Sequence, residues 1–169
     1  RERRLIGVYG DLLLSYDDFL YLNVTGRNDW TSTLPAGNNS FFYPSYNLSF
    51  VFSEVLPLPE VLSFGKIRAS YGEVGKDTEP YLTSTVYEKE LGFPIDGVLA
   101  YSRAKIRGNA ELKPERTTTI DLGTELRFLD NRVGLEFTWY KSNSKDQIFQ
   151  VPISETTGYA LLVENVGEI

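Results

Sequence analysis

This chain of 169 residues has no cysteine, no histidine and no methionine, and the first two of these residue types are common in catalytic and metal sites. Without cysteine, neither a disulfide nor a thiol redox centre can form. Without histidine, a Ser-His-Asp triad, a histidine general base and nearly every zinc site are excluded. We therefore predict no catalytic residue, no metal site and no cofactor, and we expect the chain not to be an enzyme.

Positive charge and long apolar runs are also scarce. The chain has 17 Lys+Arg against 23 Asp+Glu and a formal net charge of -6. A nucleic-acid-binding domain would show a basic face, so nucleic acid is not expected as a partner. The longest apolar runs, such as "LSFVF", fall far short of the roughly 20 residues that a transmembrane helix needs. Methionine is absent at position 1 too, and we expect a processed product or a part of a longer protein.

Aromatic residues are abundant, at 14% with 11 Tyr and 10 Phe, and they favour strands. Along much of the chain, apolar and polar residues alternate with a period of two, which predicts an all-β fold. The segments with this period cover about 5–16, 19–30, 42–53, 64–75, 116–129 and 132–142. Each is much longer than the usual strand of about 5–6 residues. They match the about 9–11 residues of a strand that crosses a bilayer at a tilt.

Residues 125–140, "ELRFLDNRVGLEFTWY", show how each segment divides into an apolar and a polar face. A two-residue turn at Asp130-Asn131 would place Glu125 directly opposite Glu136, and like charges in that position destabilise a sheet. We expect Arg127 and Arg132 to offset this repulsion. These four charged residues are predicted to form a solvated charge ladder; a cation site, an acid/base pair and a substrate contact are the alternatives.

The connections between the segments alternate strictly in length. The turns at 17–18, 54–63 and 130–131 are short, whereas the loops 31–41, 76–114 and 143–164 are long. In an up-and-down antiparallel meander, all short turns then lie at one end and all long loops at the other. Outer-membrane barrels have this arrangement, with short periplasmic turns and long extracellular loops.

Aromatic residues are predicted to form a girdle near both ends of the apolar face. The residues are Tyr16, Phe52, Phe64 and Phe128 at the short-turn ends, and Trp30, Phe42, Tyr71 and Trp139 at the long-loop ends. Two aromatic rows around an aliphatic middle are typical of a membrane barrel. Because membrane barrels have at least eight strands, we expect the six segments to form part of a larger barrel, completed by further strands.

Several stretches together resemble the SusC/RagA family of TonB-linked outer-membrane transporters. They are "RRLIGVYGDLLLSYDDFLYLNVTGRND", "RASYGEVG", "LKPERTTTIDLG" and "NRVGLEFTWYKSNSKDQI", in family order. The resemblance implies a large barrel of about 22 strands in the outer membrane of a Gram-negative cell, blocked by an N-terminal plug domain that is absent from this chain. It also implies import of glycans or peptides with a SusD-like surface lipoprotein, driven by TonB through the missing N-terminal region.

The polar face is accordingly expected to line a lumen and to contact the plug, and the apolar face to contact outer-membrane lipid. The candidates for substrate contact are polar residues near the long-loop ends: Arg27, Asp29, Tyr43, Glu73 and Tyr140. The first alternative is a passive porin-like barrel that works without TonB. The second is a soluble β-sandwich that acts as a carbohydrate-binding module.

Overall fold

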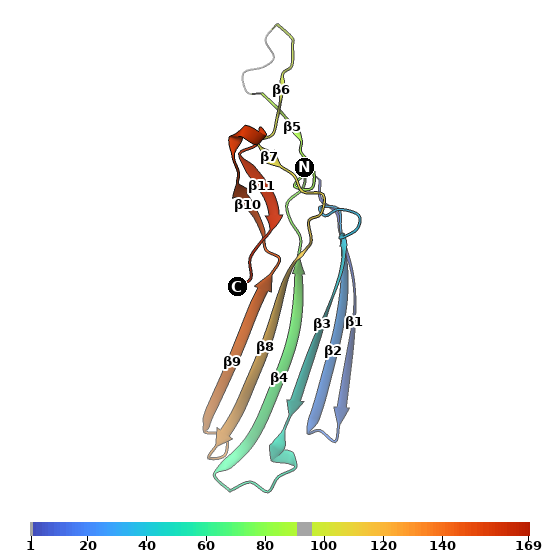
Figure 1. Ribbon diagram of the computed structural model, residues 1–169. Coiled ribbons are helices and arrows are strands. Elements are labelled where there is room, and N and C mark those ends of the chain that lie inside the picture. The colour runs from blue at the N-terminus through green and yellow to red at the C-terminus, as the bar shows by residue number, and fades with distance from the viewer. Residues whose placement is uncertain (1, 91–95) are drawn as a thin grey trace.

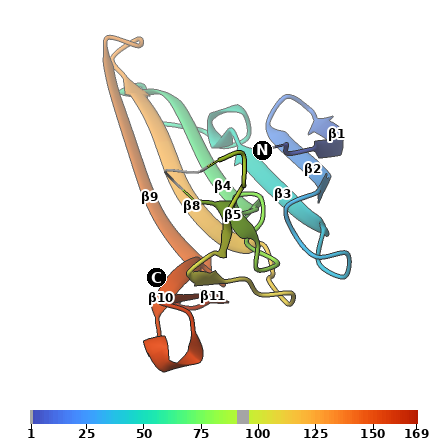
Figure 2. The ribbon, with the colours of Figure 1, turned by 90° about the horizontal axis from the view of Figure 1, so that it is seen from above.

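The computed structural model describes residues 2–90 and 96–169 and contains one large antiparallel sheet (Figure 1). Its strands lie in the order β1-β2-β3-β4-β8-β9. They are β1 (Leu5–Tyr16), β2 (Leu20–Thr31), β3 (Ser40–Phe50), β4 (Leu62–Lys76), β8 (Glu115–Phe128) and β9 (Val133–Lys145). Consecutive long strands are neighbours, so the sheet is an up-and-down meander. Seen from above, the strands follow an open arc (Figure 2).

The turns at one end of the sheet fix its register. Tyr16 pairs with Leu20 across a three-residue turn in which Asp17 and Asp18 have φ values of 44° and 55°. This odd-length turn keeps the apolar residues of β1 and β2 on one face, as their alternation requires. Phe128 pairs with Val133 across the turn between β8 and β9.

Several strand ends differ by a few residues from the predicted segments. The segment expected at 42–53 ends at Phe50, because Phe52–Glu54 forms the 3-10 helix η1 before the chain turns. At the start of β4, the register shifts between Leu62 and Phe64, which is a β-bulge. The strand β9 continues to Lys145, past the expected end at 142.

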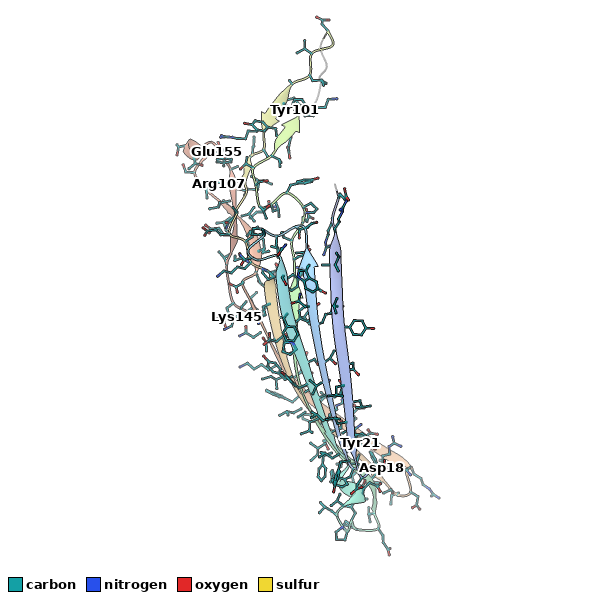
Figure 3. The ribbon with its side chains drawn as sticks, turned by 90° about the vertical axis from the view of Figure 1, so that its right-hand side faces the viewer. Asp18, Tyr21, Tyr101, Arg107, Lys145 and Glu155 are labelled. Atoms are coloured by element: carbon teal, nitrogen blue, oxygen red, sulfur yellow. The ribbon has the colours of Figure 1, made fainter. Side chains whose placement is uncertain are left out.

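Much of the apolar face of the sheet is exposed, although the apolar side chains of β2 are partly buried. Leu12 is 55% exposed, Leu48 44%, Leu122 48% and Leu135 55%. Side chains project from both faces of the thin sheet, and no second sheet of the described residues covers the apolar one (Figure 3). Neither of the two 3-10 helices in the described residues is long and apolar enough to cross a membrane. Among the described residues, no buried hydrophobic cluster covers this apolar face.

The long loops fold into small elements above the sheet (Figure 1). These elements are β5 (Tyr87–Lys89), β6 (Tyr101–Arg103), β7 (Ile106–Arg107), β10 (Ile148–Pro152), η2 (Glu155–Thr157) and β11 (Leu161–Asn165). The strands β5 and β6 form a hairpin, and β11 joins β10 antiparallel and β7 parallel. A buried hydrophobic cluster lies here and joins Leu34, Phe41, Leu112 and Val163. It holds three loops against the upper part of β3.

The residues at the C-terminal end return to the free edge of β9. The backbone N–H of Ser144 donates to the carbonyl of Ile169 at 2.7 Å, and the N–H of Ile169 donates back at 2.9 Å. Lys145 and Glu168 form an antiparallel bridge in the same register. The upper part of this edge is therefore paired.

Candidate functional site on the polar face of the sheet

The candidate site is a charged and aromatic cluster near the long-loop end of β2 and β3. The Arg27 Nε donates to Asp29 Oδ1 at 2.8 Å, and the Tyr43 hydroxyl donates to Asp29 Oδ2. Asp29 is only 4% exposed, whereas the Arg27 side chain is 45% exposed. The guanidinium carbon lies 6.0 Å from the centre of the Tyr43 ring. The structure thus brings together three of the predicted substrate-contact residues.

The local sequence explains why this cluster forms. Residues 27 and 29 lie on the same face of β2, and Tyr43 is the direct partner of Arg27 in β3. Gly7 lies opposite Asp29, where a Cβ atom would be 2.5 Å from Asp29 Oδ1. The missing side chain at Gly7 leaves room for the carboxylate. The Phe41 ring stacks on Tyr43 at 6.0 Å and joins the cluster to the buried core.

The other two predicted contact residues lie elsewhere. Tyr140 is on the polar face, opposite Asp121, and is 70% exposed. The placement of Glu73 on the polar face was wrong. Glu73 shares the parity of Tyr71, accepts a hydrogen bond from the Tyr71 hydroxyl and pairs with Arg116 at 2.8 Å. It therefore lies on the same face as the apolar residues of β4, near the long-loop end of the strand.

The charge ladder has the predicted register but different ion pairs. Glu125 lies opposite Glu136, and Glu125 pairs with Arg127 at 2.7 Å. Glu136 pairs with Arg68 of β4, also at 2.7 Å. The expected role of Arg132 was wrong, because this residue lies in the turn and Arg68 compensates Glu136 instead.

Arg68 reaches Glu136 by crossing the intervening strand β8 at Gly123. A Cβ atom on Gly123 would lie 2.5 Å from Arg68 Nε, so a glycine is needed for this path. The Arg68 Nη2 also donates to Thr138 Oγ1 at 2.8 Å. Sequence reasoning missed this contact because it joins strands that are far apart in the chain.

The predicted girdle residues lie mostly, but not all, on the apolar face. The residues on apolar positions of strands are Tyr16, Trp30, Phe42, Tyr71, Phe128 and Trp139. Phe52 lies in η1, and its ring fills the space above Gly65, where a Cβ atom would be 2.1 Å from it. Placing Phe64 in the girdle was wrong. It pairs with Arg127, whose guanidinium lies 5.2 Å from its ring, on the polar face.

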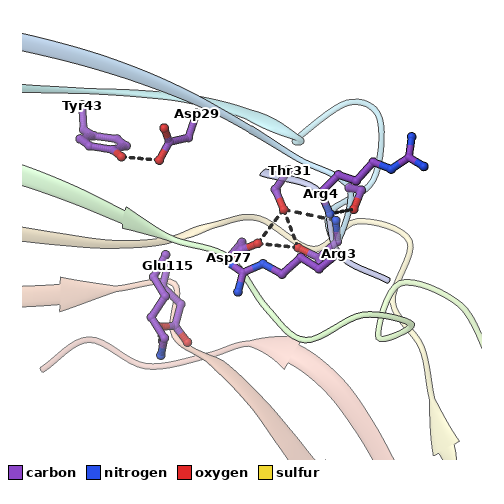
Figure 4. Close-up of polar contacts among 10 residues, drawn as sticks. Arg3, Arg4, Asp29, Thr31, Tyr43, Asp77 and Glu115 are labelled. Atoms are coloured by element: carbon purple, nitrogen blue, oxygen red, sulfur yellow. Dashed lines mark hydrogen bonds and ion pairs between the residues drawn. The ribbon is translucent and has the colours of Figure 1, made fainter. Parts of the chain in front are cut away.

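A second polar cluster, which sequence reasoning missed, ties the long loops to the sheet (Figure 4). The Asp77 carboxylate accepts hydrogen bonds from Thr31 Oγ1 at 2.6 Å and from Thr33 Oγ1 at 2.8 Å. It also pairs with Arg3, and its side chain is 7% exposed. Asp77 thus fixes the start of the loop 77–114 to the top of β2. A lone Asp after a strand gave no signal for this contact.

The candidate site keeps hydrogen-bonding capacity beyond its internal contacts. The Asp29 carboxylate is already engaged by the Arg27 guanidinium and the Tyr43 hydroxyl. The guanidinium still has N–H groups to donate, and the hydroxyl oxygen can still accept a hydrogen bond. An exposed guanidinium beside a tyrosine ring suits the hydrogen-bonding groups and flat faces of a solute or of a packed protein segment.

The exposed apolar face, the meander and the one-sided long loops define the class of protein: one part of the wall of an antiparallel membrane barrel. A family model described as TonB dependent receptor-like, beta-barrel matches residues 1–169. The chain therefore belongs to the TonB-dependent receptor β-barrel family.

Curated relatives support this assignment. TonB-dependent receptor P3 of Formosa agariphila is 29% identical over 175 residues, which cover 99% of this chain and 17% of the relative. TonB-dependent receptor SusC of Bacteroides thetaiotaomicron is 28% identical over 173 residues, covering 98% of this chain and 17% of SusC. The chain thus spans about a sixth of the length of these relatives.

Solved structures match the fold. The RagAB peptide transporter superposes with a TM-score of 0.86 at 21% identity, over 98% of this chain and 18% of the other. The siderophore receptor PirA of Pseudomonas aeruginosa gives a TM-score of 0.64 at 20% identity, over 98% of this chain and 29% of the other. Together with SusC, these matches confirm the resemblance that the sequence motifs predicted. They also confirm the all-β meander of a transmembrane barrel.

Proposed function

We propose that this chain is part of the barrel wall of a TonB-dependent transporter that imports glycans or peptides through the outer membrane of a Gram-negative cell. The observation that carries the proposal is the family match over the whole chain, on a sheet whose apolar face is exposed. The complete barrel would have about 22 strands around a plug domain. We assign no catalytic residue to it.

In this proposal the two faces of the sheet have different partners. The apolar face contacts lipid, with aromatic residues near both membrane surfaces. The polar face contacts the plug along its charge ladder, and the cluster of Arg27, Asp29 and Tyr43 contacts substrate or plug near the outer opening. The loops above the sheet face the cell exterior and contact a SusD-like lipoprotein. TonB acts through the N-terminal region that lies outside this chain.

The sandwich alternative predicts a second sheet on the apolar face, and none of the described strands provides one. The porin alternative differs from the proposal because a passive porin works without TonB and without the proton gradient. The test is uptake of labelled oligosaccharides and peptides by cells that carry the complete protein, with and without TonB. We expect uptake of one class to stop when TonB is deleted or the proton gradient is collapsed. Uptake that continues without TonB would favour a passive porin.

A further inference from the structure

Charged residues on the apolar face of the sheet are few and lie together. Among the residues of the six long strands that share this face, the charged ones are Glu73, Arg116, Lys141 and Lys145. All of them lie at the long-loop end, level with Tyr71 or beyond it. Three are positive, although the chain as a whole has a formal net charge of -6. The apolar face therefore becomes basic at one end only.

The strand register brings the three basic residues, called the basic cluster below, onto two neighbouring strands. Arg116 of β8 is the direct partner of Lys145 of β9, and Lys141 is the partner of Ile120. Lys141 and Lys145 lie about 13 Å apart along β9, a span that two long side chains can close toward each other. Figure 3 shows Lys145 near the long-loop end of the sheet. Like charges directly opposite each other destabilise a sheet, so the pairing of Arg116 with Lys145 needs compensation.

Two carboxylates compensate part of this positive charge. Arg116 Nη1 donates to Glu73 Oε2 at 2.8 Å, and Lys145 Nζ donates to Glu168 Oε1 at 3.0 Å. Both cations stay accessible, since the Arg116 side chain is 51% exposed and that of Lys145 is 59% exposed. Each keeps further N–H groups that can donate. Lys141 is exposed and has no ion-pair partner in the described part of the chain. The cluster therefore has one positive charge more than its carboxylates balance.

The position of the basic cluster indicates which anion it meets. In the proposed orientation, Tyr71 and Trp139 lie where the hydrocarbon of the membrane ends and the headgroups begin. Lysine and arginine side chains at this level direct their charged ends toward the headgroups. This tendency alone would place basic residues at both membrane surfaces. On the apolar face of the long strands they occur at the long-loop end alone. This one-sided placement favours an anionic partner in the outer leaflet.

We propose that Arg116, Lys141 and Lys145 bind the phosphate of a lipid headgroup in the outer leaflet. The inference rests on the proposed function, because that function places the long-loop end at the outer surface. Guanidinium and ammonium groups both form charge-assisted hydrogen bonds with phosphate oxygens. Phe137 and Trp139 precede Lys141 on the same face of β9 and are 63% and 47% exposed. They offer a contact surface to the acyl chains of the same lipid, which a free phosphate ion cannot use.

The test is native mass spectrometry of the complete protein in an uncharged detergent, titrated with lipid A that carries its phosphates or has had them removed. Lys141→Gln should weaken binding of the phosphorylated lipid about fivefold, the factor expected for one basic residue beside an anionic surface. It should leave binding of the dephosphorylated lipid unchanged. Lys141→Arg keeps the charge and should bind as the parent does. Arg132→Gln is the matched control, because it removes the same charge from an exposed position at the opposite end of the sheet.

Equal affinity of the parent protein for the two forms of the lipid would overturn the inference. So would an effect of Lys141→Gln no larger than that of Arg132→Gln. Displacement of lipid A by inorganic phosphate at the same concentration would show a site for a free anion and would also overturn it. Uptake measured in parallel separates these failures from failure of the proposed function. TonB-dependent uptake with lipid binding that is insensitive to Lys141→Gln leaves the transporter proposal standing, whereas uptake without TonB contradicts that proposal whatever the lipid binding shows.

Discussion

The hydrogen bond between Tyr43 and Asp29 should contribute measurably to the free energy of unfolding. Asp29 is 4% exposed and accepts from the Tyr43 hydroxyl. A hydrogen bond to a charged group contributes about 1.5–3 kcal/mol to stability. Tyr43→Phe keeps the ring, so its stacking on Phe41 should persist. We therefore expect Tyr43→Phe to destabilise the folded barrel by about 1.5–3 kcal/mol.

A double-mutant cycle with Asp29→Ala isolates this bond from other effects. The single change Asp29→Ala also frees Arg27, but that side chain is 45% exposed, so water replaces most of its lost contact. The coupling energy between positions 29 and 43 should be about 1.5–3 kcal/mol.

The measurement is guanidinium unfolding of the complete protein in detergent or lipid vesicles, followed by tryptophan fluorescence and by the gel shift of the folded barrel. Tyr140→Phe is the matched control, since Tyr140 lies on the same face and is 70% exposed. A coupling energy below about 0.5 kcal/mol, the usual scatter of additivity, would refute the argument that Asp29 is held by Tyr43.

Two further predictions concern contacts across strands. Gly65→Val should destabilise the barrel by about 1–3 kcal/mol, because the added side chain meets the Phe52 ring, whereas Gly134→Ala, with nothing within 4 Å, should fold as the parent does; equal unfolding midpoints would contradict the close approach. Arg68→Gln should lower the free energy of unfolding by about 0.2–1 kcal/mol, as expected for an exposed ion pair. Arg132→Gln should change it less, and the reverse order in the same unfolding assay would show that the turn arginine is the compensating charge.

Much of the sheet follows from the alternation of residues. The pairing of Tyr16 with Leu20, and of Glu125 with Glu136, follows from keeping apolar residues on one face across short turns. The prediction placed Glu73 and Phe64 on the wrong faces because it did not apply this alternation to them. Glu73 has the parity of Tyr71, and Phe64 has that of Arg68, but charge and aromatic character were given more weight than position.

The contacts above and across the sheet could not be predicted from alternation. Arg68 pairs with a glutamate two strands away because Gly123 leaves a path, and no local pattern signals such a path. Asp77 binds threonines that precede it by more than forty positions in the chain. The small strands of the long loops depend on a shared buried cluster, which only the folded chain assembles.

The central claim is that the apolar face contacts lipid and the polar face a water-filled or plug-filled lumen. The chain has no cysteine, so single cysteines introduced along 133–139 give defined sites for nitroxide labels in this segment. The measurement is electron paramagnetic resonance of the complete protein in lipid vesicles, comparing collisions with oxygen, which concentrates in lipid, and with a water-soluble nickel chelate. We predict that oxygen collisions peak at residues 133, 135, 137 and 139 and are low at 134, 136 and 138. Equal access of the nickel chelate to both sets would contradict the claim.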